Sequence, residues 1–156
     1  MRVLFLHGWH SRPGGRKPTF LRERGFQLSN PALDPDDFQA ALNSAQDAFD
    51  EFHPDVVVGS SRGGAVAMNI SHAGTPLVLM CPAWKNWGKA DKVDEQTILI
   101  HSSTDQVVPY SHSLDLVKRS GLKPDRLWDV GEGHRLADSQ ALSALERAIR
   151  SFAKGE

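Results

Sequence analysis

The 156-residue sequence lacks the usual marks of a secreted or membrane-spanning protein. It has a single cysteine, Cys81, which excludes an internal disulfide and indicates a reducing compartment. No apolar run approaches the roughly 20 residues that span a bilayer. Met1-Arg2 is followed by only four apolar residues, Val3 to Leu6, too few for the core of a secretory signal peptide. These features predict a soluble, cytoplasmic protein.

Net charge and histidine spacing argue against two common kinds of partner. The first is nucleic acid or an anionic membrane, and the second is a metal ion. The net charge of −1 supplies no long-range field for nucleic acid or an anionic membrane, so we expect neither as a partner. No histidine pair has a metal-ligand spacing such as H-E-x-x-H, and we expect no metal and no cofactor. The length and the 40% apolar content suit one domain, residues 1–156, with one core and no internal repeat.

Six short runs rich in β-branched and large apolar residues predict strands. Most of these runs are continuous rather than alternating, which is typical of strands that are covered on both faces. They are Val3–Leu6, Phe26–Leu28, Val56–Val58, Leu77–Met80, Ile98–Ile100 and Leu127–Val130.

Helical patterns lie between several of these runs. Asp34 as N-cap and Pro35 at the first helical position predict a helix whose apolar face runs from Phe38 to Phe52. Further helices are expected over Arg62–His72, Ser111–Ser120 and Leu142–Phe152. Strands that alternate with helices predict an α/β protein, with a parallel sheet covered on both faces. Ligands of such sheets bind beyond the carboxyl ends of the strands.

A G-x-S-x-G motif, Gly59 to Gly63, stands where the third strand should end and a buried helix should begin. In a nucleophile elbow the central Ser has a strained backbone, and the residues two positions before and after it must be small. Ser61 meets that requirement. Ser60 does not, because Val58 lies two residues before it. The alternative is a glycine-rich turn with an incidental serine.

Three further polar segments follow predicted strands: His7-Gly8-Trp9, Asp105-Gln-Val-Val-Pro109 and Gly131-Glu132-Gly133-His134. Together with the elbow, these segments resemble the small, cap-less serine esterases of the α/β-hydrolase family. In that family the acid and then the histidine follow the nucleophile along the chain. The resemblance covers nearly the whole sequence.

The resemblance implies a minimal α/β-hydrolase fold with a six-stranded parallel sheet in the order 2-1-3-4-5-6. The two N-terminal strands of the full fold would be absent. Larger relatives insert a lid domain after the fourth strand, where this sequence has only the fifteen residues Pro82 to Gln96. We therefore expect no lid domain and an open site.

The resemblance also implies catalytic roles. Ser61 would be the nucleophile, His134 its general base, and Asp105 the acid that orients the histidine. The backbone N–H groups of Trp9 and Arg62 would form the oxyanion hole. The expected reaction is hydrolysis of small carboxylic esters through an acyl-enzyme. Thioesters or amides are the nearest alternatives, and a catalytically silent hydrolase-fold binding protein is a further one.

Several side chains near these motifs have two interpretations. Asp129 or Glu132 could replace Asp105 as the acid. His10, Arg12, Trp84 and Trp87 are candidates for the substrate pocket, although core packing would serve the tryptophans equally well.

The Arg62 side chain could pair with Asp105 or a first-loop carbonyl, or it could join Arg12 or Arg16 in binding a substrate anion. The Gly8–Gly15 loop could also hold a phosphate, but it matches neither nucleotide-binding consensus.

Three other residues have simpler interpretations. We expect His7 to brace its own loop, His101 to be a hydrogen-bonded structural residue, and Cys81 to be a buried apolar residue.

Overall fold

The computed structural model describes residues 1–155 and contains one sheet of six parallel strands in the order β2-β1-β3-β4-β5-β6. The expected strand order is therefore confirmed. In register, Val3 pairs with Val56 and Phe5 with Val58. The strands are β1 (Arg2–Leu6), β2 (Gln27–Ser29), β3 (Val56–Ser60), β4 (Leu77–Met80), β5 (Thr97–His101) and β6 (Leu127–Asp129).

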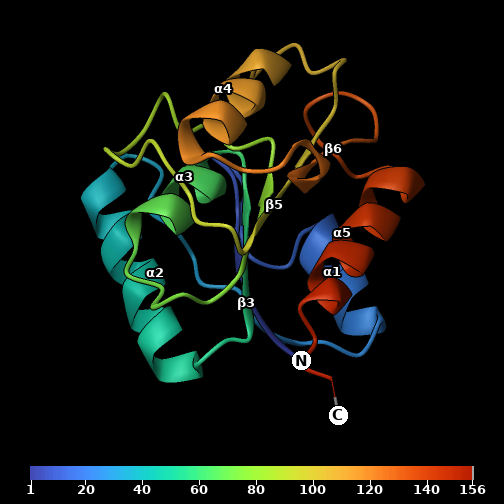
Figure 1. Ribbon diagram of the computed structural model, residues 1–156. Helices are drawn as coiled ribbons and strands as arrows, with labels where there is room; N and C mark the ends of the chain where they lie inside the picture. Colours follow the sequence, from blue (N-terminus) through green and yellow to red (C-terminus); the bar gives the residue numbers. More distant parts are fainter. Residues whose placement is uncertain (156) are drawn as a thin grey trace.

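Helices cover both faces of the sheet, as Figure 1 shows. The helices are α1 (Arg16–Glu23), α2 (Phe38–Phe52), α3 (Arg62–Asn69), α4 (Tyr110–Ser120) and α5 (Ser139–Ser151), with a short 3-10 turn η1 (Pro124–Arg126) before β6. Helices α1 and α5 pack on one face, and α2, α3 and α4 pack on the other.

The continuous apolar strands supply both cores at once. Successive side chains of a strand point to opposite faces, so one strand contributes to two clusters. In β1, Val3 and Phe5 join the cluster under α1 and α5, whereas Leu4 and Leu6 join the cluster under α2 and α3. This double burial explains why the strands show no polar alternation.

The start of α2 differs from the prediction. The N-cap is Asp37, whose Oδ1 accepts a hydrogen bond of 3.0 Å from the Ala40 N–H. Asp34 instead closes a turn before the helix, because its Oδ1 accepts the N–H groups of Asp36 and Asp37. In both cases an Asp side chain accepts backbone N–H groups two or three residues ahead, so the sequence alone does not distinguish a turn from a helix cap.

Two other helices also differ from the sequence-based expectation: one prediction ends too late, and one helix has no prediction. Helix α3 ends at Asn69 rather than His72, and its C-cap Ile70 is already extended. Helix α1 was not predicted. Its buried residues are only Pro18, Phe20 and Leu21, and so short an apolar stripe gives little periodic signal.

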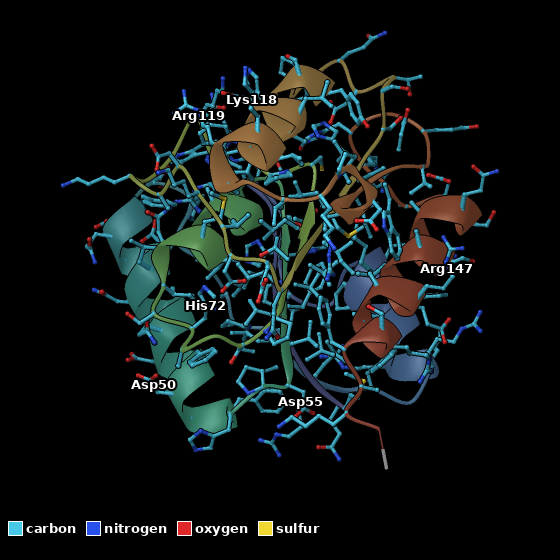
Figure 2. All side chains as sticks on the ribbon, in the orientation of Figure 1. Asp50, Asp55, His72, Lys118, Arg119 and Arg147 are labelled. Atoms are coloured by element: carbon cyan, nitrogen blue, oxygen red, sulfur yellow. The ribbon has the colours of Figure 1, made fainter. Side chains whose placement is uncertain are left out.

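The loops that follow the strands meet at the upper edge of the sheet in Figure 1. Asp55, which immediately precedes β3, marks the opposite edge at the bottom of Figure 2. Residues 81–96, between β4 and β5, contain neither helix nor strand. Among residues 1–155, no helix combines the length and apolar character needed to cross a bilayer.

Candidate active site

The elbow places Ser61 between β3 and α3 in a strained backbone conformation, with φ 56° and ψ −117°. A positive φ at a non-glycine residue costs free energy and persists only where the surroundings impose it. A Cβ on Gly59 would collide with the Gly63 carbonyl, and one on Gly63 would collide with the Leu6 carbonyl. The turn therefore requires both glycines, and they flank Ser61 rather than Ser60.

A continuous hydrogen-bond chain joins three of the predicted residues. Ser61 Oγ lies 2.9 Å from His134 Nε2, and His134 Nδ1 lies 2.8 Å from Asp105 Oδ2. The residues are distant in the chain, 73 positions apart for the first pair and 29 for the second. With Nδ1 donating to the carboxylate, Nε2 is free to accept the serine proton.

The Asp105 carboxylate is buried and held from several sides. Its Oδ1 accepts the N–H groups of Val107 at 2.8 Å and Val108 at 2.9 Å. Burial raises the pKa of Asp105, but the hydrogen bonds from His134 and these two amides outweigh burial, so the pKa lies below its ordinary value. Asp105 is therefore a carboxylate at neutral pH.

The alternative acids are placed elsewhere. Asp129 Oδ1 accepts the Ser103 N–H at 2.9 Å, and Glu132 is exposed. Within residues 1–155, neither side chain is hydrogen-bonded to His134. The structure thus gives His134 one carboxylate partner, Asp105.

His101 is a second histidine on the same carboxylate, and the sequence interpretation missed this contact. Its Nε2 lies 3.1 Å from Asp105 Oδ2 and 3.0 Å from the Val108 carbonyl, so this nitrogen carries the proton. Its Nδ1 can then accept from Ser113 Oγ at 2.7 Å. Burial lowers the pKa of His101, which keeps the ring neutral. The i, i+4 spacing of His101 and Asp105 at the end of a strand was the available signal.

The loop after β1 packs directly against the elbow. A Cβ on Gly8 would lie 3.4 Å from the Ser60 carbonyl oxygen and 3.5 Å from Ser61 Cβ. Among residues 1–155, the N–H groups of Trp9 and Arg62 have no hydrogen-bond acceptor. These are the two donors expected to face an oxyanion, and Arg62 N–H also begins α3, where the helix dipole favours negative charge.

His7 holds this loop in place. Its Nδ1 lies 2.9 Å from the Gly8 carbonyl, and its Nε2 accepts the Leu33 N–H at 3.0 Å. The second contact requires an unprotonated Nε2, so Nδ1 is the donor to Gly8. His7 therefore braces the loop, as its position predicted.

A pocket of about 390 Å³ opens beside Ser61 and His134. His10 and Arg12, two of the four predicted pocket residues, line it. The His10 ring stacks on Trp9 with 4.2 Å between ring centroids.

The two predicted tryptophans lie elsewhere. Trp84 is buried in the core beneath α4, and its Nε1 donates to the His112 carbonyl at 3.0 Å. Trp87 packs edge-on against Trp9, with ring centroids 5.3 Å apart, and faces the Arg62 guanidinium. The core alternative therefore applies to Trp84, and neither tryptophan lines the pocket beside Ser61.

The Arg62 side chain points away from that pocket. It is buried, and its Nη2 donates to the Asp34 carbonyl at 2.7 Å. The guanidinium also lies over the Phe38 ring, 5.5 Å from the centroid. The structural interpretation of Arg62 fits this geometry, although its partner is neither Asp105 nor a first-loop carbonyl.

Cys81 adjoins the hydrogen-bonded residues but does not extend their chemistry. Its Sγ donates to the His134 carbonyl at 3.2 Å, and burial raises its pKa to about 12. The ligand atoms of Cys81, Asp105 and His134 lie within 4.8 Å of one another. A metal would need a thiolate and free nitrogen and oxygen donors, whereas here the thiol is protonated and the other donors bond each other. The donor set does not fit a metal.

Comparison with known proteins supports these observations at the level of fold. No family model matches the chain. It is 32% identical over 85 residues to "Alpha/beta hydrolase domain-containing protein aho-3" of Caenorhabditis elegans, which is 54% of this chain and 25% of that protein. The match thus spans about a quarter of the curated relative's length.

Solved structures match over almost the whole chain. Alpha/beta hydrolase domain-containing protein 10 from mouse has a TM-score of 0.74 at 14% identity, covering 97% of this chain and 88% of that one. A serine hydrolase without lid from Xanthomonas campestris has a TM-score of 0.66 at 16% identity, covering 99% and 84%. At these identities the likeness concerns the fold, and the chemistry must be argued from the site.

Proposed function

This chain has the α/β-hydrolase fold, and from the site which that fold carries we propose that it is a serine hydrolase that cleaves small carboxylic esters. The observation that carries the proposal is the hydrogen-bond chain from Asp105 through His134 to Ser61. It ends on a serine whose strained backbone presents Oγ at the carboxyl edge of the sheet.

The geometry suits acyl transfer in two steps. Ser61 Oγ attacks the ester carbonyl while His134 Nε2 takes its proton. The N–H groups of Trp9 and Arg62 bind the resulting oxyanion, each contributing about 3–4 kcal/mol to transition-state stabilisation. His134 then protonates the leaving alcohol, and water hydrolyses the acyl-enzyme by the same route.

Asp105 remains ionised throughout these steps. Its carboxylate orients His134 and stabilises the imidazolium that forms during attack. The neutral His101 adds a hydrogen bond to the same Oδ2 without adding a competing positive charge.

The segment between β4 and β5 supports an open site for small substrates. Residues 81–96 form no helix that could cover a long acyl chain. Thioesters and amides remain alternative substrates because the same three residues serve them. The buried, protonated Cys81 is compatible with the cytoplasmic location that we propose.

A fluorophosphonate probe tests the proposal against a catalytically silent binding protein. We expect the wild-type protein to be labelled and to hydrolyse 4-nitrophenyl acetate. The Ser61→Ala variant should lose labelling and reduce kcat by roughly 10³-fold or more, since the attacking oxygen is removed. Its melting temperature and circular dichroism should remain those of a folded protein.

Ser60→Ala is the matched control, because it removes the neighbouring hydroxyl and should retain labelling. A dead Ser60→Ala variant beside an active Ser61→Ala variant would place the nucleophile one residue earlier. An unlabelled, inactive wild-type protein would favour the binding-protein alternative.

A further inference from the structure

The pocket beside Ser61 is lined by an unusual set of charges. Four basic residues contribute to it, and no Asp or Glu does. We call them the pocket cations: Arg12, Arg16, Lys17 and Arg135. They come from the β1–α1 loop, from the start of α1 and from the loop that carries His134.

The pocket cations form no ion pair with any of residues 1–155. Other basic side chains of the protein do have carboxylate partners. Arg24 and Arg150 both pair with Glu146, and Arg119 pairs with Asp115. The pocket therefore concentrates positive charge that the protein itself leaves uncompensated, although the net charge of the whole sequence is −1.

The start of α1 adds to this positive charge. Its N-cap is Gly15, which has no side chain to accept the first N–H groups, and its first turn contains no acid. The N–H groups of Arg16 and Lys17 have no acceptor within residues 1–155. The amino end of a helix favours anions, so two cations in the first turn are unfavourable unless an anion accompanies them.

Lys17 is the most enclosed of the four. Its side chain is half-buried, and its Nζ donates to the Arg135 carbonyl, which leaves two N–H donors with no acceptor among residues 1–155. Burial lowers its pKa, and the positive charge of Arg135 lowers it further. The negative charge of a bound anion would act in the opposite direction and stabilise the charged ammonium group.

We propose that the pocket cations bind an anionic group, a carboxylate or a phosphate, that the ester substrate carries. This inference deepens the proposed hydrolase function and rests on it. Arginine guanidinium groups suit carboxylate and phosphate oxygens, and a cleft lined by one sign of charge concentrates oppositely charged substrates. Ser61 and His134 line the same pocket, so one substrate molecule can place its carbonyl at Ser61 and its anionic group at the pocket cations.

Two matched ester pairs test the inference. 4-Nitrophenyl butyrate and mono-4-nitrophenyl succinate differ only in a terminal methyl or carboxylate on the acyl side. Methyl 4-acetoxybenzoate and 4-acetoxybenzoate place the same kind of contrast on the leaving group. We expect wild-type kcat/KM to favour the anionic member of at least one pair, and this preference to fall at high ionic strength.

The variants Arg16→Gln and Lys17→Met should remove that preference. Each should raise KM for the anionic ester roughly tenfold, because a hydrogen bond to a charged group is lost, and leave the neutral ester little changed. Lys118→Met is the matched control. It removes one positive charge from the exposed surface of α4, outside the pocket, where Figure 2 shows Lys118. Equal losses on charged and neutral esters would overturn the inference.

Anion binding can be measured without turnover. We expect succinate or inorganic phosphate to raise the melting temperature of the Ser61→Ala variant, and to do so less when Lys17→Met is added. A response to succinate alone would assign the group as a carboxylate, and a response to phosphate alone as a phosphate. Anion binding without ester hydrolysis would contradict the hydrolase proposal, and with it the assignment of the anion to an ester substrate, but not the anion site itself. Hydrolysis without anion preference or anion binding would overturn the inference only.

Discussion

At the residue scale, Asp105 is the most connected side chain of the site. One oxygen, Oδ2, is shared by His134 at 2.8 Å and His101 at 3.1 Å, while Oδ1 accepts two backbone amides. This arrangement leaves the carboxylate little freedom to rotate. In the proposed mechanism His101 is thus a positioning residue for Asp105 rather than a group that contacts substrate.

This role predicts different effects of two His101 substitutions. His101→Gln keeps an amide N–H that can donate to Asp105, and should retain most of the wild-type kcat. His101→Leu leaves the buried carboxylate without that donor and should lower kcat roughly 10-fold or more at unchanged KM. Steady-state kinetics with 4-nitrophenyl acetate measures both.

A purely structural role for His101 would give another pattern. In that case Leu and Gln variants would lose stability to a similar extent and show similar kcat once correctly folded. The pH profile of kcat supplies a second readout, since only a change at Asp105 would shift it.

At the element scale, the β3–α3 turn depends on close backbone approach. Gly63 lies where a side chain would overlap the Leu6 and His7 carbonyls at the end of β1, and Gly64 lies against Pro82. Backbone atoms of adjacent elements cannot move aside as a flexible side chain can. The glycines therefore set the distance between α3 and the sheet as well as the shape of the elbow.

We accordingly expect Gly63→Ala to be strongly destabilising, by about 3 kcal/mol or more, because α3 must shift to accommodate the added methyl. Urea unfolding monitored by circular dichroism would show a lower midpoint. Gly155→Ala is the control, since nothing lies within 4 Å of its added Cβ. A Gly63→Ala variant of wild-type stability would mean that the elbow is looser than the structure indicates.

At the scale of the whole molecule, buried ionisable groups make stability depend on pH. Burial lowers the pKa of His101 and His112 below the ordinary 6.5. Burial raises the pKa of Asp105 and Asp138, but hydrogen bonds outweigh it and hold both below the ordinary 3.8. In all four cases the unfolded chain binds the proton more readily than the folded protein does, so acid favours unfolding.

Stability should therefore decrease in two stages as the pH falls. The first begins below about pH 6.5 as the unfolded histidines gain protons, with a slope of at most about 1.4 kcal/mol per pH unit for each group. The second begins below about pH 4, as the contributions of Asp105 and Asp138 are lost. Unfolding midpoints measured from pH 8 to pH 3 would reveal both stages, and His101→Gln should weaken only the first. A flat profile between pH 7 and pH 5 would contradict this.

The absence of a lid helix between β4 and β5 also predicts a preference for short acyl chains. With no lid helix in residues 81–96, a long acyl chain gains little apolar contact. Esters of short acids should be hydrolysed faster than esters of long acids, without activation at a lipid interface. Nitrophenyl esters compared below their aggregation limits test this, and a higher kcat/KM for long chains would contradict it.

Much of the fold could be predicted from local sequence patterns, because strand burial and the steric limits of a tight turn depend on residues close together in the chain. Continuous apolar runs predicted strands buried on both faces, and the spacing of Gly59 and Gly63 distinguished Ser61 from Ser60. The order of the six strands followed from a resemblance carried by four short motifs. Local patterns failed where the same type of side chain can do two different things. Asp34 closes a turn, whereas Asp37, three residues later, caps the helix.

The sequence by itself determined which residues could take part in chemistry and the edge of the sheet on which they would gather. Only the tertiary structure decided their partners. Packing brought Ser61 and His134 together across 73 positions, gave Asp105 a second histidine, and turned Arg62 towards the Asp34 carbonyl. It also buried Trp84 and grouped the pocket cations beside Ser61. Backbone propensity acts over a few residues, whereas such contacts depend on how whole elements pack.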